Sequence, residues 1–314
     1  MRTLVTGGAG FIGSTLVDRL LAEGHHVDVV DDLSTGSLAN LAEARATPGH
    51  ELTFHRLDIR EPALIELVAH RRPEVVFHLA AQADVRVSVE RPAFDAEVNI
   101  IGTLNVLEGA RAAGSRKVVF AASGGTLYGE PQKLPVPESH PQRPLSPYGV
   151  SKKAACDYLA AYRELYGIEF TALALANIYG PRQDPHGEAG VVAIFAGRLL
   201  AGEPCTIFGD GNQTRDFVYV DDVVDAFARA AHKGSGLLMN IGTGVETSVN
   251  ELYLTMATAA GSDAPAAYAP ARPGELARSS LDPSRAGIHL GWKSWTTMEA
   301  GAAEVLRWFA ARKS

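Results

Sequence analysis

The chain contains 314 residues with a formal net charge of −7 at pH 7, and 46% of its residues are hydrophobic and 21% are charged. This composition is typical of a folded globular protein with room for about two domains, and it argues against an intrinsically disordered chain. An acidic total without a basic stripe argues against nucleic acid as a partner.

Cysteine content and hydropathy narrow the class further. The two cysteines, Cys156 and Cys205, have a spacing that fits neither a disulfide framework nor a metal site. The most apolar later run, at 191–200, is interrupted by Arg198 and is too short to cross a bilayer. The first residues lead into a short strand without the apolar core of a secretory leader. We therefore expect a cytoplasmic protein that binds neither a metal nor a membrane.

The first predicted strand, at 3–5, runs directly into a glycine-rich turn, Thr6-Gly7-Gly8-Ala9-Gly10-Phe11-Ile12-Gly13. Gly7 permits a sharp turn, Gly10 lets the backbone approach a pyrophosphate, and Gly13 lets the next helix pack closely on the sheet. The N-terminus of that helix offers free N–H groups and a partial positive charge to the pyrophosphate. An amphipathic stretch at 14–22 supplies the helix, so the pattern predicts a dinucleotide site.

The second predicted strand, at 27–30, ends in Asp31. An acidic side chain at this point accepts hydrogen bonds from an adenosine ribose and repels a 2′-phosphate. The sequence therefore predicts NAD rather than NADP as the cofactor.

Strands and helices continue to alternate beyond this point. We predict strands at 52–56, 74–79 and 116–122 and helices at 62–69 and 92–113, which indicates parallel crossovers and a doubly wound α/β sheet. Ligands of such sheets bind beyond the carboxyl ends of the strands. The residues at those ends or on facing helices are Asp58, Ala80, Ala81, Gln82, Asn99 and Ser123. His78 lies inside an apolar strand, and we expect it to pack in the core.

A Tyr-x-x-x-Lys motif lies near the middle of the chain, in Ser146-Pro147-Tyr148-Gly149-Val150-Ser151-Lys152. Ser146 can cap a helix and Pro147 is tolerated in its first turn, so Tyr148 and Lys152 share one helical face. A phenol has a pKa near 10, and a fixed ammonium beside it favours the phenolate. Such a spacing also arises by chance, but beside a dinucleotide pattern it predicts an acid/base pair.

In these motifs the chain resembles the extended short-chain dehydrogenase/reductase superfamily, and within it the nucleotide-sugar epimerases of the UDP-galactose (UDP-glucose) 4-epimerase type. The resemblance extends over nearly the whole sequence. It also includes Asp58-Ile59, His78-Leu79-Ala80-Ala81, Tyr128-Gly129, Asn177-Ile178-Tyr179-Gly180-Pro181-Arg182, the stretch 209–222, Asn240-Ile241-Gly242-Thr243-Gly244 and Arg272-Pro273-Gly274-Glu275.

The resemblance implies a Rossmann doubly wound parallel sheet with a smaller α/β C-terminal substrate domain. We expect residues 1–176 to form the NAD domain, with 215–240 and about 297–314 returning to it. Residues 177–214 and 241–296 would form the substrate domain. The long helices at 92–113 and 147–166 would pair with their copies in a homodimer.

The resemblance also implies the mechanism and the cofactor contacts. Tyr148 would act as acid and base at the sugar C4 hydroxyl, and Lys152 would hold the nicotinamide ribose. The implied NAD contacts are Gly7, Gly10, Phe11, Ile12, Gly13, Asp31, Asp32, Asp58, Ile59, Ala80, Ala81, Gln82, Asn99, Tyr148 and Lys152.

One expected catalytic hydroxyl is missing. Family members commonly carry Ser or Thr at the place of Gly124, where it hydrogen-bonds the reacting hydroxyl. Ser123 is our first substitute and Thr126 the second. Related 4,6-dehydratases carry an Asp-Glu pair at the places of Gly125 and Thr126, and dehydration needs such an acid and base. Their absence favours epimerisation.

Substrate contacts fall in the second half of the chain. The resemblance assigns Asn177, Arg215 and Arg272 to the diphosphate, because guanidinium groups pair with phosphate, and Glu275 to the uridine ribose. Phe208 and Val192 are wall contacts or, equally well, core residues.

Three alternatives to a UDP-galactose/UDP-glucose epimerase stay open. Ser279 replaces a bulky residue of some relatives and would leave room for UDP-GlcNAc. Arg182 could bind a uronate, which keeps a UDP-glucuronate 4-epimerase in view. A non-catalytic sensor of NAD is the alternative from another class, favoured by Gly124 alone.

Overall fold

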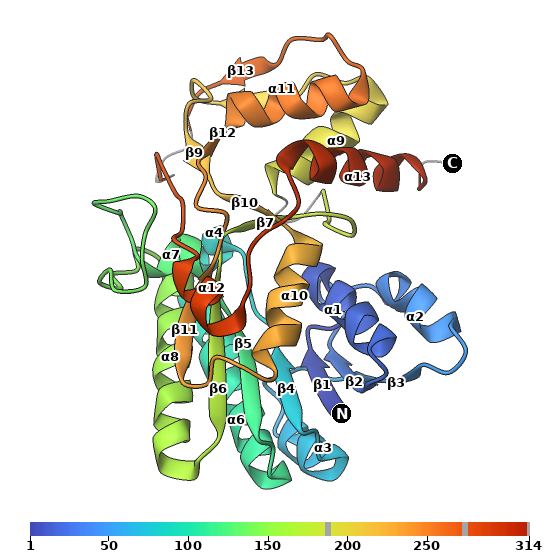
Figure 1. Ribbon diagram of the computed structural model, residues 1–314, viewed down its shortest axis with the longest axis vertical. Coiled ribbons are helices and arrows are strands. Elements are labelled where there is room, and N and C mark those ends of the chain that lie inside the picture. Colours follow the sequence, from blue (N-terminus) through green and yellow to red (C-terminus); the bar gives the residue numbers. More distant parts are fainter. Residues whose placement is uncertain (186–189, 272–275, 313–314) are drawn as a thin grey trace.

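The computed structural model describes residues 1–185, 190–271 and 276–312, and its centre is a seven-stranded sheet in the order β11-β6-β5-β4-β1-β2-β3 (Figure 1). All neighbouring strands of this sheet are parallel. The predicted doubly wound sheet is therefore confirmed. The strands are β1 (Arg2–Thr6), β2 (His26–Asp31), β3 (Glu51–Arg56), β4 (Val75–His78), β5 (Lys117–Ser123), β6 (Glu169–Leu175) and β11 (Leu237–Ile241).

Helices cover both faces of the sheet. Successive strand side chains point to opposite faces, so Val76 joins the apolar cluster under one layer of helices and Phe77 the cluster under the other. The first layer is α3 (Ala63–Arg71), α6 (Gly102–Ala113) and α8 (Pro147–Tyr166), and the second is α1 (Phe11–Ala22), α10 (Val220–Ala230) and α12 (Ser284–Leu290). A short turn, η1 (Leu38–Leu41), and α2 (Ala42–Ala46) follow β2.

The predicted helix at 92–113 is interrupted by a π-turn. It comprises α5 (Pro92–Ala96), the π-turn η2 (Glu97–Ile101) and α6, and a short helix that we did not predict, α4 (Val85–Glu90), precedes it. A π-turn inserts one residue into a helix and is frequent at functional sites. Asn99 lies within it.

A smaller layer lies over the carboxyl edge of the sheet (Figure 1). Its helices are α9 (Val191–Ala201), α11 (Val249–Ala260) and α13 (Met298–Ala310). Three strand pairs accompany them: β7 (Asn177–Tyr179) with β10 (Phe217–Tyr219), β9 (Thr214–Arg215) with β12 (Thr247–Ser248), and β8 (Thr206–Phe208) with β13 (Ala267–Ala269).

Two helices, α13 and α12, pack on the opposite side of the expected boundary between the NAD domain and the substrate domain. We placed the last helix with the NAD domain, but α13 packs on α9 and α11, because its buried side includes Gly301, Val305 and Leu306. A Cβ on Gly301 would lie 2.1 Å from the Tyr179 hydroxyl oxygen, so glycine permits this contact. Conversely, α12 packs on β11 and α10, although we expected 241–296 in the substrate domain. The rest of the domain division stays a prediction.

Two buried carboxylates fix the places where the chain crosses between the layers. Asp216 accepts hydrogen bonds from the Thr243 N–H (2.8 Å) and hydroxyl (2.6 Å), from the Gly244 N–H (3.1 Å) and from the Leu281 N–H (3.1 Å). Asp222 accepts bonds from the Trp295 N–H (3.0 Å) and from Thr296. These neutral donors offset the cost of burying each charge.

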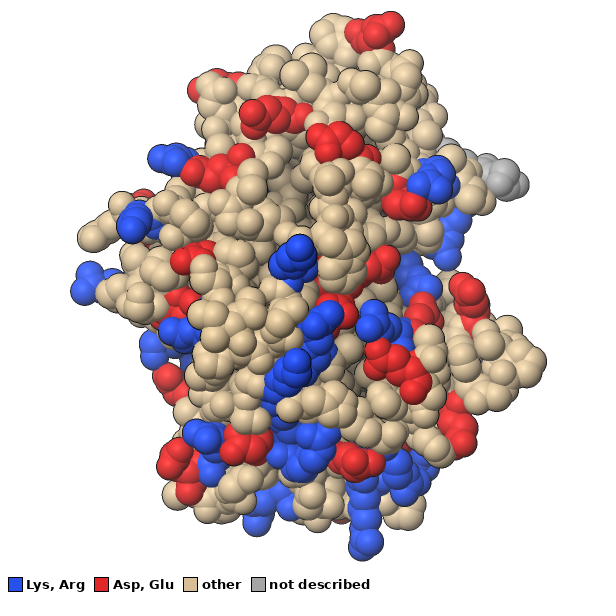
Figure 2. All heavy atoms as spheres, viewed as in Figure 1, with Lys and Arg blue, Asp and Glu red and all other residues tan. Residues whose placement is uncertain are grey.

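The surface agrees with the composition. Basic and acidic side chains are both spread over the face drawn in Figure 2. Within the described residues, every helix is too short or too polar to cross a bilayer.

His78 is packed in the core, as predicted. It is 1% exposed, and its Nδ1 lies 2.7 Å from the Thr6 hydroxyl and its Nε2 2.9 Å from the Thr103 hydroxyl. The Thr103 hydroxyl donates to the Asn99 carbonyl, so it accepts from a protonated Nε2, and Nδ1 accepts from Thr6. Burial, and then the charge of Lys152, lower the pKa of His78 to about 3.

We predict that His78 makes the folded protein sensitive to acid. Between pH 6.5 and about 3 the unfolded chain binds a proton at this residue and the folded chain does not, so the free energy of unfolding falls as the pH falls through this window. Urea unfolding as a function of pH should show that His78→Gln reduces this slope by up to about 1.4 kcal/mol per pH unit. The exposed His70→Gln is the control, and identical slopes for the two variants would contradict the assignment.

Candidate active site

Tyr148 and Lys152 lie on the first two turns of α8, against the sheet. The Ser146 hydroxyl accepts a hydrogen bond from the Gly149 N–H (3.2 Å), and Pro147 occupies the first turn, so the helix begins as the sequence predicts. The Lys152 ammonium lies 5.8 Å from the centre of the Tyr148 ring, which confirms that the two side chains share a face.

Lys152 carries a deeply buried ammonium. Its Nζ donates to the Ala121 carbonyl of β5 (2.9 Å) and lies 4.7 Å from the centre of the Phe120 ring. Burial lowers the pKa of Lys152 to about 8, while the charges of Cys156 and Asp95 act in the opposite direction. The ammonium is therefore held in one place, and its charge depends on its neighbours.

A cleft of about 300 Å³ opens beside this pair. Four of the predicted residues, Ser123, Thr126, Asn177 and Arg215, lie around it together with Tyr148. The rest of its lining is Ala83, Val85, Gly125, Leu175, Ala176, Leu276 and Ser279. Sequence reasoning missed Ala83, Val85, Leu175, Ala176 and Leu276 as lining residues, although the first two lie shortly after a predicted strand end. Nothing in the local sequence placed Leu276 there.

The structure explains why residue 124 is glycine. A Cβ at Gly124 would lie 2.3 Å from the Leu281 Cδ1 atom, so the Leu281 side chain occupies the space of the usual hydroxyl. The Thr126 hydroxyl, in α7 (Gly124–Leu127), is buried and has no hydrogen-bond partner among the described residues. Because buried hydroxyls are normally paired, this one fits a ligand better than Ser123, our first choice.

The glycine-rich turn has the backbone approaches that a pyrophosphate site requires. Gly7 has φ of 69°, and a Cβ there would lie 2.7 Å from the Ala80 nitrogen. A Cβ on Gly13 would lie 2.0 Å from the Gly7 carbonyl oxygen. Gly10 begins α1 without a side-chain cap, so the N–H groups of Phe11 and Ile12 are left for an anion.

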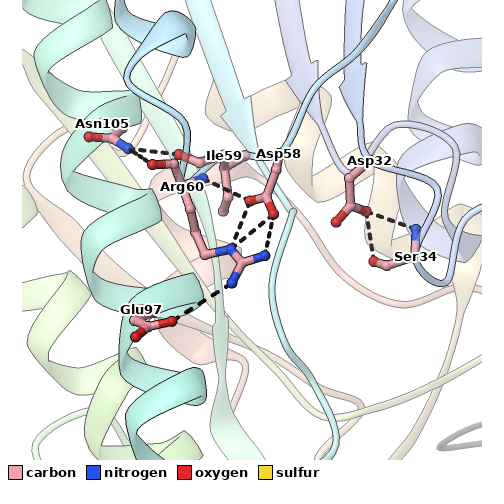
Figure 3. A network of polar contacts seen from close by, with 7 residues as sticks. All are labelled: Asp32, Ser34, Asp58, Ile59, Arg60, Glu97 and Asn105. Carbon is pink, nitrogen blue, oxygen red and sulfur yellow. Dashed lines mark hydrogen bonds and ion pairs between the residues drawn. The ribbon is translucent and has the colours of Figure 1, made fainter.

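Two aspartates lie at the end of β2, where the sequence predicts the adenosine: Asp31 is the last residue of the strand and Asp32 follows it. Asp31 accepts from the Ala9 and Leu33 N–H groups, each at 2.9 Å, and burial raises its pKa. Asp32 accepts from the Ser34 N–H (2.8 Å) and hydroxyl (2.7 Å), as Figure 3 shows.

Asp58 faces the same region and is held by an arginine. Arg60 reaches it with its Nε (3.1 Å to Oδ1) and its Nη2 (2.5 Å to Oδ2), which lowers the pKa of Asp58 (Figure 3). The Asn105 amide donates to the carbonyls of Ile59 (2.9 Å) and Arg60 (3.0 Å). Glu97 also lies 3.7 Å from the Arg60 guanidinium. These contacts hold Asp58 and Ile59 in place without a ligand.

The loop after β4 is fixed by Asn99. The Gln82 N–H donates to the Asn99 side-chain oxygen (3.0 Å), and the Asn99 amide donates to the Gln82 carbonyl (2.9 Å). The Ala80 N–H donates to the Thr6 hydroxyl (3.2 Å). The structure therefore brings four of the predicted NAD contacts, Ala80 to Gln82 and Asn99, into one cluster.

The residues predicted for the substrate are only partly brought together. Asn177 is exposed at the start of β7, and Arg215 donates to the carbonyls of Thr214 and Leu276, each at 2.8 Å. Phe208 is half-buried in β8, whereas Val192 is 1% exposed in the apolar core, so Val192 is a packing residue rather than a wall of the cleft. Arg272 and Glu275 lie outside the described residues.

Arg182 is engaged elsewhere. Its guanidinium forms an ion pair with Asp18 of α1 (2.6 Å), and it does not line the cleft. This arrangement argues against Arg182 as a contact for a uronate. The loop residues 186–189 that follow it lie outside the described residues.

Comparison with known proteins agrees with this geometry. The family model described as GDP-mannose 4,6 dehydratase matches residues 4–305. The UDP-glucose 4-epimerase of Mycolicibacterium smegmatis is 53% identical over 310 residues, which cover 98% of each chain. The structure of UDP-glucose 4-epimerase with UDP-glucose from Thermotoga maritima is 45% identical, with a TM-score of 0.96 and 100% of each chain covered. The structure of the Thermus thermophilus UDP-glucose 4-epimerase in complex with NAD is 44% identical, with a TM-score of 0.90 and 99% of each chain covered.

We predict that residue 124 accommodates a side chain only if Leu281 moves. Gly124→Ala should lower the free energy of unfolding by about 1–3 kcal/mol, because Leu281 must move. Gly125→Ala is the matched control, since no described atom lies within 4 Å of its added Cβ. Urea unfolding of both variants measures the difference, and in a Leu281→Ala background Gly124→Ala should cost less than it does in the unmodified protein, because the close contact is gone. Equal stability of the two single variants would refute the steric explanation.

Proposed function

Because the chain belongs to the family of NAD-dependent nucleotide-sugar epimerases and dehydratases within the extended short-chain dehydrogenase/reductase superfamily, we propose that it interconverts UDP-galactose and UDP-glucose at C4. The observation that carries the proposal is the Tyr148/Lys152 pair beside a cleft with a buried Thr126 hydroxyl that has no partner among the described residues. NAD is the cofactor, and the protein is an isomerase.

Tyr148 is the proposed acid and base. The Lys152 ammonium, held by the Ala121 carbonyl at 2.9 Å, places a positive charge near the phenol and favours its ionised form. Tyr148 then takes the proton of the C4 hydroxyl. After the 4-keto sugar has rotated within the site, Tyr148 returns a proton to the C4 oxygen. Thr126 donates a hydrogen bond to the same oxygen in both directions.

Bound NAD would supply the reversible hydride chemistry at C4, which no side chain can provide. Residues from six segments would hold it. The uncapped start of α1 would bind the pyrophosphate, Asp31, Asp32, Asp58 and Ile59 would bind the adenosine, and Ala80 to Gln82, Asn99 and Lys152 would bind the nicotinamide side. The close approaches at Gly7 and Gly13 support this fit, because any side chain there would fill the turn.

The absence of a carboxylate at Gly125 and Thr126, which line the cleft, favours epimerisation over dehydration. Gly125 lines the cleft with open space around its missing side chain, so a carboxylate would have room there. Without a carboxylate at Gly125 or Thr126, no acid and base pair stands where water would be eliminated from the keto sugar. The keto sugar is therefore reduced again.

On the substrate side, Asn177 and Arg215 line the cleft and are the proposed diphosphate contacts, together with Arg272. Phe208 and Glu275 are proposed contacts of the uridine. UDP-GlcNAc is a second candidate substrate, because the small Ser279 lines the cleft and leaves space at the sugar. UDP-glucuronate has less support, since Arg182 pairs with Asp18.

We also propose a homodimer formed through α8 and its neighbour α6. Val150, Tyr158 and Leu165 lie on one side of α8 and are 52%, 39% and 70% exposed, and Ile101 of η2 is 49% exposed. Apolar side chains repeated along one exposed helical face are typical of a helix that packs against a partner.

The first test follows conversion of the sugar without added NAD. Proton NMR of UDP-galactose with the purified protein should show UDP-glucose anomeric signals rising to a plateau. Tyr148→Phe should slow this conversion by about 10²–10⁴-fold, whereas Tyr158→Phe, on the exposed side of the same helix, should not. An unchanged spectrum, repeated with added NAD and then with UDP-GlcNAc and UDP-glucuronate, would rule out the function.

The second test concerns the dimer. The double variant Val150→Glu/Leu165→Glu should sediment as a monomer, because charges on this face oppose its burial. Leu254→Glu, on the exposed face of α11, is the control and should keep the mass of the unmodified protein. A monomeric unmodified protein would refute the proposal.

A further inference from the structure

Asp95 is a fully buried carboxylate close to the active site that the proposed mechanism does not use. It lies in α5 and is 0% exposed. One of its oxygens accepts a hydrogen bond from the Ser151 hydroxyl, and the other accepts from the side-chain amides of Asn99 and Gln82, each at 3.0 Å. A buried carboxylate is costly unless it is hydrogen-bonded, so these three donors account for its presence in the core.

The three donors come from three separate segments, each of which carries a residue proposed above to hold the nicotinamide side of NAD. Ser151 directly precedes Lys152 in α8, Asn99 lies in the π-turn η2, and Gln82 lies in the loop after β4. Asn99 and Gln82 are also joined by two hydrogen bonds of their own. Asp95 is thus the point at which the helix of the catalytic pair is attached to that loop and turn.

Asp95 also affects the charge of Lys152. Its three donors are neutral groups, and the ammonium of Lys152 is bonded to the Ala121 carbonyl. The titratable groups around this ammonium are Asp95 of α5, Cys156 and Tyr148 of α8, and His78 of β4. Burial raises the pKa of the Cys156 thiol to about 12 and lowers the pKa of His78 to about 3, and Asp95 is the one carboxyl group among these four side chains.

We propose that Asp95 is a positioning residue for the reaction, which holds α8 in place against Asn99 and Gln82 and balances the buried charge of Lys152. The proposal rests on the proposed function, because it assigns a role through Lys152 and Tyr148. It makes two separable claims, one about attachment and one about charge.

Two variants separate the claims. Asp95→Asn removes the charge and keeps the attachment: its oxygen can accept from Asn99 and Gln82, and its amide can donate to the Ser151 hydroxyl, which also donates to the Pro147 carbonyl (3.0 Å). Ser151→Ala removes the attachment to α8 and keeps the charge. Asp222→Asn is the matched control, because Asp222 is equally buried but bonds to Trp295 and Thr296.

The experiment records kcat for the 4-epimerisation and the Kd of NAD, each as a function of pH from 6 to 10. For Asp95→Asn, the loss of kcat and of NAD affinity on the alkaline side should begin about one pH unit lower, because the Lys152 ammonium loses a favourable charge. For Ser151→Ala, the pH dependence should stay in place while kcat falls on the order of tenfold through misplacement of α8. Asp222→Asn should shift neither profile.

Several outcomes would overturn the proposal. Profiles of Asp95→Asn that superimpose on those of the unmodified protein would refute the claim about charge. A lower melting temperature with unchanged kcat and Kd in both variants would reduce Asp95 to a structural residue. If the unmodified protein converts none of the three UDP-sugars, the proposed function fails, while the pH dependence of the NAD Kd still decides the role of Asp95.

Discussion

The hydrogen bonds of Asp216 are the interaction on which the shape of the site depends. Asp216 lies between β9, which ends at Arg215, and β10, which begins at Phe217. It accepts hydrogen bonds from the backbone N–H groups of Thr243, Gly244 and Leu281. These residues are distant from Asp216 in sequence and lie on two different segments. Because the Leu281 side chain lies against Gly124, this buried carboxylate connects the segment between β9 and β10 to the residue beside the cleft-lining Ser123 and Gly125.

The second feature is the burial of opposite charges beneath the reacting group. Lys152 is 3% exposed and Asp95 is 0% exposed, and neither is paired directly with the other in the hydrogen bonds of the described residues. Each charge is instead satisfied by neutral groups, the Ala121 carbonyl for the one and hydroxyl and amide donors for the other. Charges held in this way act over a short distance in a medium of low polarity, where they influence proton transfer more than they would in water.

Two open questions and one wrong expectation have a common physical cause. The sequence leaves Val192 as either a wall contact or a core residue, and the α9 helix turns it into the core. We expected the last helix, α13, in the NAD domain because of the family resemblance, but its apolar side packs against α9 and α11. Arg182 looked free for a ligand because its partner, Asp18, lies in the first helix. Contacts between segments distant in sequence decided all three.

The sequence by itself determined the first five strands of the sheet, the glycine-rich turn and the start of α8, because these depend on local patterns: apolar runs, glycines that permit close backbone approach, and a Ser-Pro cap. It also determined that Tyr148 and Lys152 share a face, since four residues make about one helical turn. Only the tertiary structure decided that Leu281 excludes a side chain at Gly124, that the Thr126 hydroxyl is left without a partner among the described residues, and that Asp95 joins three segments. These facts follow from distances between residues far apart in the chain, which no local pattern contains.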